Sequence, residues 1–469
     1  MKKIIFSLTI ILASLMNLHS QENVHSLYFL NEWSQRHTLN ASFAPEYGYF
    51  SLPVLGGIEF GVKSNVGLST FLYPPKDGSS EYMLFMNKQV GADEFLGKFK
   101  SDVYINQALN LNLLSIGLYI LENDFVSFNF SLKEKLNVNV PKDLFRLMKE
   151  GMTQPTNHYD LKNFGIEQVN YMQAALGYSR DINSKIRVGV TAKLLMGISA
   201  EKINYNKFDV MLSDSEYKIR AEGSAEIMSG ILSFEKDEDG QSDFTKIKTD
   251  FSGLIAGSGF AVDLGVTYKP IDKLTVAVAI NDLGGISWKT DASQISKAVS
   301  EVSFTGFNGM DIQDMDISEQ LEQMKEDLGN LVKFKDENAS GNLFRGISHV
   351  ANISAEYNVF SFLSLDILVG ALWRNYNYGP VNVNDIVGAI TVKPLSWITA
   401  SGTYEITGIG GNKVGLSLNL SPKFINLYIA TDYAFPKLNP QFIPIDNARV
   451  NFVLGGSIAL GRGSKKDKE

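Results

Sequence analysis

The sequence contains no cysteine among its 469 residues, so disulfide bonds, thiolate metal sites and a lipid anchor on cysteine are excluded. Beyond the N-terminus, no stretch reaches the roughly 18–20 apolar residues that a membrane-spanning helix needs. The formal net charge of −8 argues against nucleic acid as a partner. These absences are compatible with soluble β folds and with transmembrane β-barrels. The strands of such barrels alternate apolar and polar residues, so their average hydropathy is not high enough to be detected.

Catalytic signatures are missing as well. Only five histidines occur, and none has a second ligand at the spacing of a zinc site. The sequence has no G-x-S-x-G nucleophile elbow, no P-loop and no dinucleotide fingerprint. We therefore expect neither an enzyme nor a bound metal or cofactor.

The N-terminus has the pattern of an export signal. Met1-Lys2-Lys3 supplies positive charge, Ile4–Met16 is a short apolar run, and Asn17–Ser20 is a plausible cleavage zone. The alternative is a membrane anchor, for which the apolar run is short. We expect residues 1–20 to act as a signal peptide that exports the chain.

Apolar and polar residues alternate in many segments. Between Phe260 and Tyr268 every second residue is apolar, and Asp263 falls on the opposite side. A period of two is typical of a β-strand with one apolar face. We count fourteen such strands: 57–72, 103–120, 124–138, 168–180, 185–200, 259–269, 273–283, 348–359, 362–374, 383–393, 396–406, 412–421, 423–434 and 447–460.

Short and long connections alternate between these strands, and 201–258 and 284–347 are the longest. In an antiparallel meander, successive connections lie at opposite ends, so the long loops gather at one end. Short periplasmic turns and long extracellular loops are typical of outer-membrane barrels. We predict an all-β fold, a transmembrane antiparallel up-and-down β-barrel of about 14 strands over residues 57–461, with a polar tail at 462–469.

Charged side chains fall on the less apolar faces of the strands. The opposite faces are nearly free of charge, as lipid requires, since Arg or Lys at the bilayer midplane costs about 2–4 kcal/mol. A soluble β-sandwich, the alternative fold, gives no reason for this separation. We expect the following lumen charges to form ion pairs in a polar interior: Lys133, Arg187, Lys193, Asp263, Glu356, Asp366, Glu405 and Asp432.

Residues 21–56 precede the first predicted strand. A segment of this size can enter the lumen from the periplasmic end as a plug, because a fourteen-strand barrel is wider than its own side chains fill. Asn40 and Pro45 lie in this plug segment on either side of Phe43. An ordinary N-terminal strand or a flexible leader is the alternative.

Two long loops contain helical patterns. Pro141–Glu150 is a short candidate with proline in its first turn. In loop 284–347, Asp316–Glu319 resembles a capping box, and a stripe at helical spacing follows. Its apolar members are Ile317, Leu321, Met324, Leu328 and Leu331. These helices either form a lid or docking surface at the barrel mouth or simply pack on neighbouring loops.

The hairpin around Pro270 resembles a recurrent element of FadL-type outer-membrane proteins. Gly265, Tyr268 and Pro270 precede the turn, and Asp282-Leu283-Gly284 ends the next strand. Leu39–Phe43 is similar to the family's Asn-Pro-Ala-Phe hatch motif, with alanine and serine in place of proline and alanine. Residues 51–56 resemble the start of strand one in a Bacteroidota branch of such barrels. The resemblance implies a monomeric barrel with an N-terminal plug in the outer membrane.

The resemblance also implies two possible functions. Typical relatives pass hydrophobic small molecules through the outer membrane, and here Phe43, Leu321, Met324 and Leu328 would supply apolar contacts. Other relatives serve a secretion machine, so the chain is alternatively a non-transporting accessory or scaffold barrel for a secreted or surface protein. An apolar pocket beside the plug favours the first function, and a lumen filled by paired charges favours the second. A diffusion porin is a third alternative.

Overall fold

The computed structural model describes residues 24–51, 56–74, 82–214, 216–236, 241–249, 253–289, 293–304, 334–337, 343–378, 381–408, 412–422, 424–434 and 449–462. The expected signal peptide and nearly all of the expected polar tail lie outside these ranges. Within them, no helix is long and apolar enough to cross a membrane.

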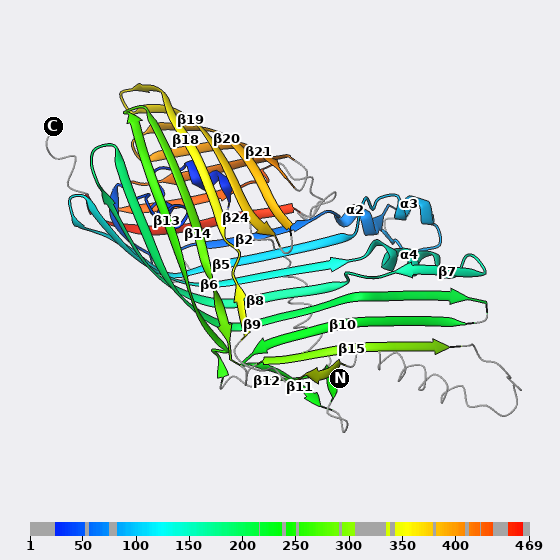
Figure 1. Cartoon of the computed structure of the whole chain (residues 1–469). Coiled ribbons are helices and arrows are strands. Elements are labelled where there is room, and N and C mark those ends of the chain that lie inside the picture. The colour runs from blue at the N-terminus through cyan, green and yellow to red at the C-terminus, as the bar shows by residue number, and fades with distance from the viewer. Residues whose placement is uncertain are drawn as a thin grey trace, which may run out of the picture.

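Fourteen antiparallel wall strands form a closed barrel (Figure 1). The first wall strand consists of β1 (Tyr47–Ser51) and β2 (Ile58–Ser64), and both pair with β5 on one side and β24 on the other. Because β24 returns to the first wall strand, each described wall strand pairs with a neighbour on both sides. The other thirteen follow in chain order: β5 (Val103–Leu121), β6 (Asp124–Val140), β8 (Gly165–Asp181), β9 (Ile186–Ser213), β13 (Gly257–Ile271), β14 (Leu274–Trp288), β18 (Val350–Phe362), β19 (Leu365–Tyr378), β20 (Val381–Leu395), β21 (Ile398–Thr407), β22 (Asn412–Leu420), β23 (Ile425–Thr431) and β24 (Arg449–Arg462).

The fourteen predicted strands correspond in order to the wall strands, so the predicted barrel is confirmed. The first differs most, because residues 47–51 of the expected plug segment belong to the wall. Residues beyond Ser64 leave the wall and form α2 (Leu68–Phe71) and β3 (Leu72–Tyr73), which pairs with β4 (Met83–Leu84). The apolar side chains there pack in an aromatic cluster outside the barrel instead of facing lipid.

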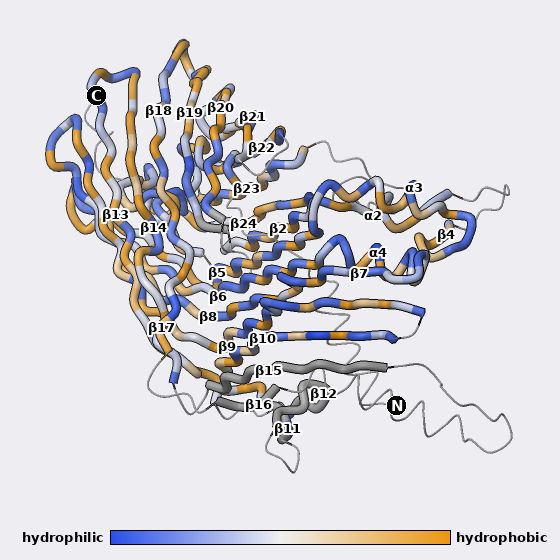
Figure 2. The backbone as a smooth tube through the Cα atoms, turned by 45° about the vertical axis from the view of Figure 1, so that its right-hand side comes forward, coloured by the Kyte–Doolittle hydropathy of each residue, from blue (hydrophilic) through white to orange (hydrophobic). Residues whose placement is uncertain are grey.

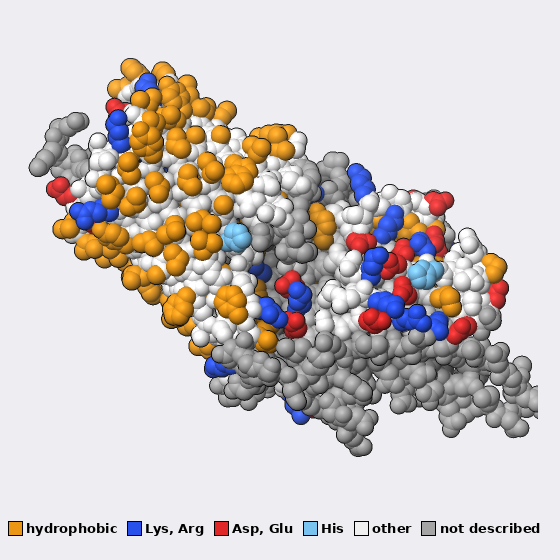
Figure 3. Space-filling model, in the orientation of Figure 1, with side chains coloured by type: hydrophobic (Ala, Val, Ile, Leu, Met, Phe, Trp, Pro, Cys, Tyr) orange, Lys and Arg blue, Asp and Glu red, His pale blue; other side chains and the backbone are white. Residues whose placement is uncertain are grey.

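Wall side chains alternate between lipid and lumen, as Figure 2 shows for the hydropathy along the strands. In β13, Phe260 is 73% exposed, whereas the neighbouring Ala261 and Asp263 are 2% exposed. Apolar side chains cover the outer wall, and charged ones gather toward its ends and over the loops (Figure 3). Such an apolar band around a closed barrel matches the hydrocarbon core of a bilayer.

The short turns lie at one end of the barrel, here called the turn end, and the long connections at the other, the loop end (Figure 1). At the loop end, α3 (Ala92–Leu96) and α4 (Lys142–Glu150) cover one side. The helix predicted over 141–150 is therefore confirmed, with Pro141 directly before its first residue. The helix predicted from Asp316 onward lies outside the described residues.

The wall sheet divides at β9. Up to Gly197, β9 pairs with β13, whereas from Ser199 onward it pairs with β10 (Tyr217–Ser229). This fork starts a second sheet that projects away from the barrel (Figure 1). The second sheet also contains β7 (Thr156–Asp160), β15 (Ser293–Phe304), β16 (Phe334–Glu337), β12 (Gln241–Thr249) and β11 (Leu232–Lys236), while β17 (Leu343–Gly346) extends the wall beside β14. Much of the expected loop 201–258 is therefore strand, because β9 continues through Ile203, Tyr205 and Phe208 and pairs with β10.

The N-terminal segment, residues 24–45, lies inside the barrel (Figure 1). It contains two short 3-10 helices, η1 (His25–Phe29) and η2 (Arg36–Thr38). Its apolar side chains form a core with small and aromatic side chains of the wall, among them Ala277, Val387 and Tyr428. Burial of this apolar surface stabilises the segment within an otherwise polar lumen.

Candidate functional site

The start of the N-terminal segment is held by a buried charge cluster. The backbone N–H groups of His25 and Ser26 donate to Asp432 at 2.8 and 3.1 Å. The His25 ring contacts Glu405 through Nδ1, and Glu405 pairs with Lys413 at 2.8 Å. Burial alone would lower the pKa of His25, but the attraction of Glu405 and Asp432 outweighs it, so that the pKa is raised.

The donor atoms of His25, Glu405 and Asp432 are close enough together to be tested as a metal site. Asp432 already accepts the two N–H groups of the segment and a third from Asn451 Nδ2 at 3.1 Å. The Lys413 ammonium already neutralises Glu405. This donor set does not fit a resident cation, and we assign the cluster to anchoring the segment.

Further along, the segment is bound to several wall strands. Arg36 pairs with Glu356 of β18, and its guanidinium lies 4.0 Å from the centre of the Phe43 ring. Glu32 pairs with Lys393 of β20. Charge-assisted contacts of this kind, spread around the barrel, fix the position of the segment in the lumen.

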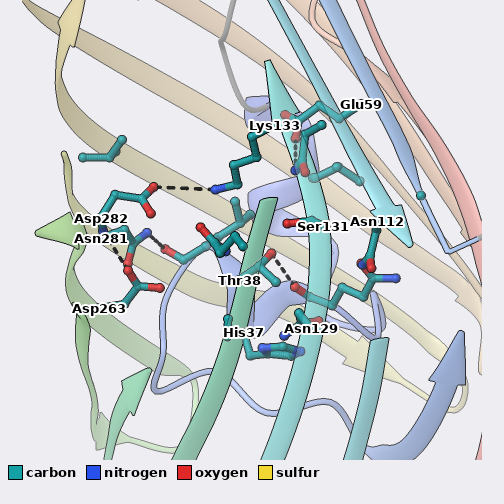
Figure 4. Close-up of a pocket in the computed structure, with 18 of the residues that line it drawn as sticks. His37, Thr38, Glu59, Asn112, Asn129, Ser131, Lys133, Asp263, Asn281 and Asp282 are labelled. Atoms are coloured by element: carbon teal, nitrogen blue, oxygen red, sulfur yellow. Dashed lines mark hydrogen bonds and ion pairs between the residues drawn. The ribbon is translucent and has the colours of Figure 1, made fainter. Parts of the chain in front are cut away.

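A cavity of about 120 Å³ lies in the lumen between the segment and the wall (Figure 4). Lys193 of β9 contacts Asp263 of β13 at 2.6 Å and Asp282 of β14 at 2.7 Å, and Lys133 of β6 lies 3.9 Å from Asp282. Asp282 has a positive φ of 62°, which turns it inward at a bulge, and its N–H donates to Asp263 at 2.7 Å. The Asp282-Leu283-Gly284 triplet thus supplies a lumen charge.

The cavity has polar groups on its wall beside apolar side chains such as Leu27 and Leu39. The side-chain oxygens of Gln173 and Asn281 line it and have no hydrogen-bond partner among the described residues. Buried polar atoms of this kind are normally satisfied by water or by a bound molecule. The described lumen therefore presents hydrogen-bonding groups and paired charges beside the segment, and the apolar pocket that would favour hydrophobic cargo is not found at this position.

A second cavity, of about 470 Å³, lies at the fork. It shares Lys135, Asp282 and Ser348 with the lumen cavity, so the two adjoin. A third, of about 950 Å³, opens at the turn end beside Pro45 and Lys393. The N-terminal segment separates the lumen cavity from this third one.

The structure places the sequence-predicted residues in different roles. Lys133, Lys193 and Asp263 meet at the lumen cavity, whereas Glu356, Glu405 and Asp432 hold the N-terminal segment. Arg187 pairs with Asp181 at 3.1 Å, and Asp366 accepts a hydrogen bond from Ser361 near the turn end. Of these residues, Lys133, Lys193 and Asp263 line the lumen cavity.

The predicted plug and ligand residues also separate. Phe43 does not line the lumen cavity, since it is buried against Tyr28 and Arg36. Asn40 is buried and accepts hydrogen bonds from Ser42, and the Pro45 carbonyl accepts one from Tyr119. The apolar contacts predicted at Leu321, Met324 and Leu328 lie outside the described residues.

Several important residues were not singled out from the sequence. Lys413 follows the same alternation as the other lumen charges and was recoverable from that pattern. His25 and Arg36 belong to a segment without periodicity, so nothing in the sequence connects them to partners more than 300 residues away.

The sequence matches a family model over residues 41–432, and that family is described as a family of unknown function, DUF5723. The chain belongs to this family. A comparison of this DUF5723 protein with curated proteins gives no match.

Solved structures similar to this DUF5723 protein include two toluene transporters and a FadL homologue. The Pseudomonas putida toluene transporter TodX has a TM-score of 0.40 at 9% identity, covering 94% of this chain and 95% of that chain. The Ralstonia pickettii toluene transporter TbuX has a TM-score of 0.40 at 8% identity, covering 91% of this chain and 94% of that chain. A Pseudomonas aeruginosa FadL homologue has a TM-score of 0.34 at 9% identity, covering 89% of this chain and 91% of that chain. These TM-scores are too low to support a conclusion about function. The closed barrel follows instead from the strand register of this chain.

Proposed function

We propose that this protein is an outer-membrane transporter for small hydrophobic or amphipathic molecules, in which the N-terminal segment acts as a movable plug. The observation that carries the proposal is the order of the cavities. The fork cavity adjoins the lumen cavity, and the segment lies between the lumen cavity and the opening at the turn end, since its residues line both. A molecule that follows this order reaches the periplasmic side only after the plug shifts.

The way in which the plug is held supports a transporter more than a permanently closed wall. Ion pairs and hydrogen bonds make many of its contacts with the barrel, including those at Glu32, Arg36 and His25. Polar contacts can exchange with water once the lumen hydrates, whereas the apolar core between the segment and the wall must separate for the segment to move. The segment therefore has a route to an open state that preserves the barrel.

A second candidate function is an accessory or scaffold barrel. It is favoured by the second sheet, in which β10 and β15 project beyond the wall, and by the paired charges of the lumen. In this alternative the plug stays in place and the projecting sheet holds a secreted or surface protein. The two functions differ in whether the plug must move.

An engineered disulfide tests this difference. The hydroxyl oxygens of Ser34 in the plug and Ser457 in β24 lie 2.8 Å apart, and the chain has no native cysteine to interfere. The variant Ser34→Cys/Ser457→Cys is assayed in cells by uptake of N-phenyl-1-naphthylamine, a hydrophobic fluorophore that an intact outer membrane excludes. Ser34→Cys alone is the matched control.

A transporter requires that the wild type and the single variant raise uptake above cells without the protein. The oxidised double variant should lose this uptake, and a reductant should restore it. Uptake that persists after oxidation contradicts a moving plug. A wild type without uptake, recovered together with a defined surface protein, supports the scaffold barrel.

A further inference from the structure

The fork between the barrel wall and the projecting sheet encloses a cavity of about 470 Å³. This volume lies within the range of about 300–1,000 Å³ that small-molecule sites occupy. We infer that the fork cavity is a binding site for an uncharged amphiphile, a molecule with an apolar chain or ring and an oxygen that accepts a hydrogen bond. The inference rests on the proposed transport function and deepens it, since it names the outer site and the class of molecule.

The apolar part of the ligand is matched by one wall of the cavity. Met228 comes from the projecting sheet, whereas Tyr171, Ile286 and Trp288 come from the barrel. Met228, Ile286 and Trp288 are each buried to 98% or more. These side chains pack together in one apolar cluster, which forms a firm apolar wall where the two sheets diverge.

Trp288 is fixed in position by glycines of the neighbouring strands. A Cβ on Gly197 would lie 2.7 Å from the indole Cη2, and one on Gly257 would lie 3.0 Å from Cε3. The ring therefore occupies the space that side chains on β9 and β13 would take. Residues of β9, β13 and β14 together therefore determine where the ring lies on the cavity wall.

The polar part of the ligand is matched by the Trp288 indole. Its Nε1–H is buried and has no hydrogen-bond partner among the described residues, although Trp288 lines the cavity. Indole Nε1 is only a donor, so its partner must be an acceptor. A hydroxyl or carbonyl oxygen on the ligand satisfies this otherwise costly buried group.

The charges around the cavity do not favour an anionic ligand. Three cationic side chains and four carboxylates line it, so they nearly cancel: Lys135, Lys202 and Arg345 against Glu167, Glu201, Glu226 and Asp282. Arg345 and Glu226 form an ion pair with each other. A carboxylate ligand would gain little from this set, in which the carboxylates outnumber the cations by one.

Fluorescence of Trp288 tests the assignment. The variant Trp33→Phe/Trp373→Phe/Trp397→Phe leaves Trp288 as the only tryptophan of the four. Reconstituted in lipid nanodiscs, it is titrated with 10-bromodecan-1-ol, whose bromine quenches indole on contact. In this background Ala200→Phe fills the cavity, because Ala200 is buried and lines it. Ala192→Phe, on the exposed face of the same strand, is the matched control.

We expect saturable quenching that excess decan-1-ol relieves and excess decanoate does not. Quenching should fall at least several-fold in Ala200→Phe and remain in Ala192→Phe. Linear quenching that is equal in both variants reports only partition into lipid and overturns the site. Displacement by decanoate as well as by the alcohol overturns the uncharged class.

This result is separable from the plug experiment. If the disulfide controls uptake but Trp288 is not quenched saturably, the fork site is wrong and transport stands. If quenching saturates but the barrel does not transport, the site is supported as a binding site and the transport function is wrong.

Discussion

Gly189 of β9 and Gly265 of β13 lie directly opposite each other in the barrel wall, and the N-terminal segment rests against both. A Cβ on Gly189 would overlap the Ala41 carbonyl, and one on Gly265 would overlap the side-chain oxygen of Asn40. Adjacent glycines on neighbouring strands thus form a recess for residues 40–42. The recess lets the backbone of the N-terminal segment approach the wall more closely than any other residue type at these two positions permits.

Gly189→Val should displace residues 40–42 without breaking the wall. Forcing extra methyl groups into a packed contact costs about 1–3 kcal/mol, and here the segment can yield more easily than the sheet. We expect faster entry of arabinose into proteoliposomes, with the barrel still folded by circular dichroism. Ala192→Val, which faces outward on the same strand, should leave entry unchanged. Equal arabinose entry in the two variants would show that the recess does not seat the plug.

The Lys193 triad should be the most sensitive charge cluster beside the lumen cavity. Lys193→Met leaves Asp263 and Asp282 buried without their nearest cation, which costs about 3–5 kcal/mol of unfolding free energy. Adding Asp263→Asn should recover part of this loss, because one uncompensated carboxylate is removed. Urea unfolding in lipid vesicles measures each step of the cycle.

The control for this cycle is Lys207→Met. Lys207 pairs with Glu222 at 3.2 Å, but both side chains are more than one-third exposed. Removing an exposed pair typically changes the unfolding free energy by about 0–1 kcal/mol. Similar losses for Lys193→Met and Lys207→Met would mean that the lumen cluster is well solvated.

The sequence allows the wall of this barrel to be predicted almost strand by strand. Every outward-facing position must be apolar because it meets lipid, so apolar and polar residues alternate along each strand. This alternation can be recognised within a single strand. Phe260 and Leu264 can be assigned to the lipid face without knowledge of any other strand. The alternation of connection lengths then gives the up-and-down order.

The contents of the lumen could not be predicted in this way. The partner of His25 lies 380 residues away on β21, and no local rule connects the two. The fork at Gly197 was missed because β9 continues without a break while its neighbour changes from β13 to β10. A strand pattern shows which side faces lipid, but it does not show which strand lies beside it.

His25 should make the plug more stable at neutral than at alkaline pH. Because its pKa is raised in the folded protein, the charged ring contributes stability that is complete below its ordinary pKa, about 6.5. That contribution is lost as the pH rises through the folded value. Thermal unfolding followed from pH 6 upward should show falling stability, and His25→Gln should remove this component. A variant that falls as steeply as the wild type would place the titration elsewhere.

His37 should act in the opposite direction. It is buried, and its Nε2 lies 2.6 Å from the Tyr49 hydroxyl, while no carboxylate among the described residues pairs with its ring. Burial lowers its pKa from 6.5 to about 3. Between these two pKa values, the ring binds a proton in the unfolded state but not in the folded state. Stability should therefore fall with decreasing pH by up to about 1.4 kcal/mol per pH unit.

His37→Gln keeps a hydrogen-bonding group but cannot take up this proton. We expect its unfolding free energy to depend less steeply on pH than that of the wild type between about pH 6.5 and 3. His158→Gln is the control, since His158 lies at the surface and is 61% exposed. If His37→Gln and the wild type lose stability in parallel on acidification, then His37 accepts its proton in the folded barrel. In that case water reaches the ring through the lumen and the plug is looser around η2 than its burial indicates.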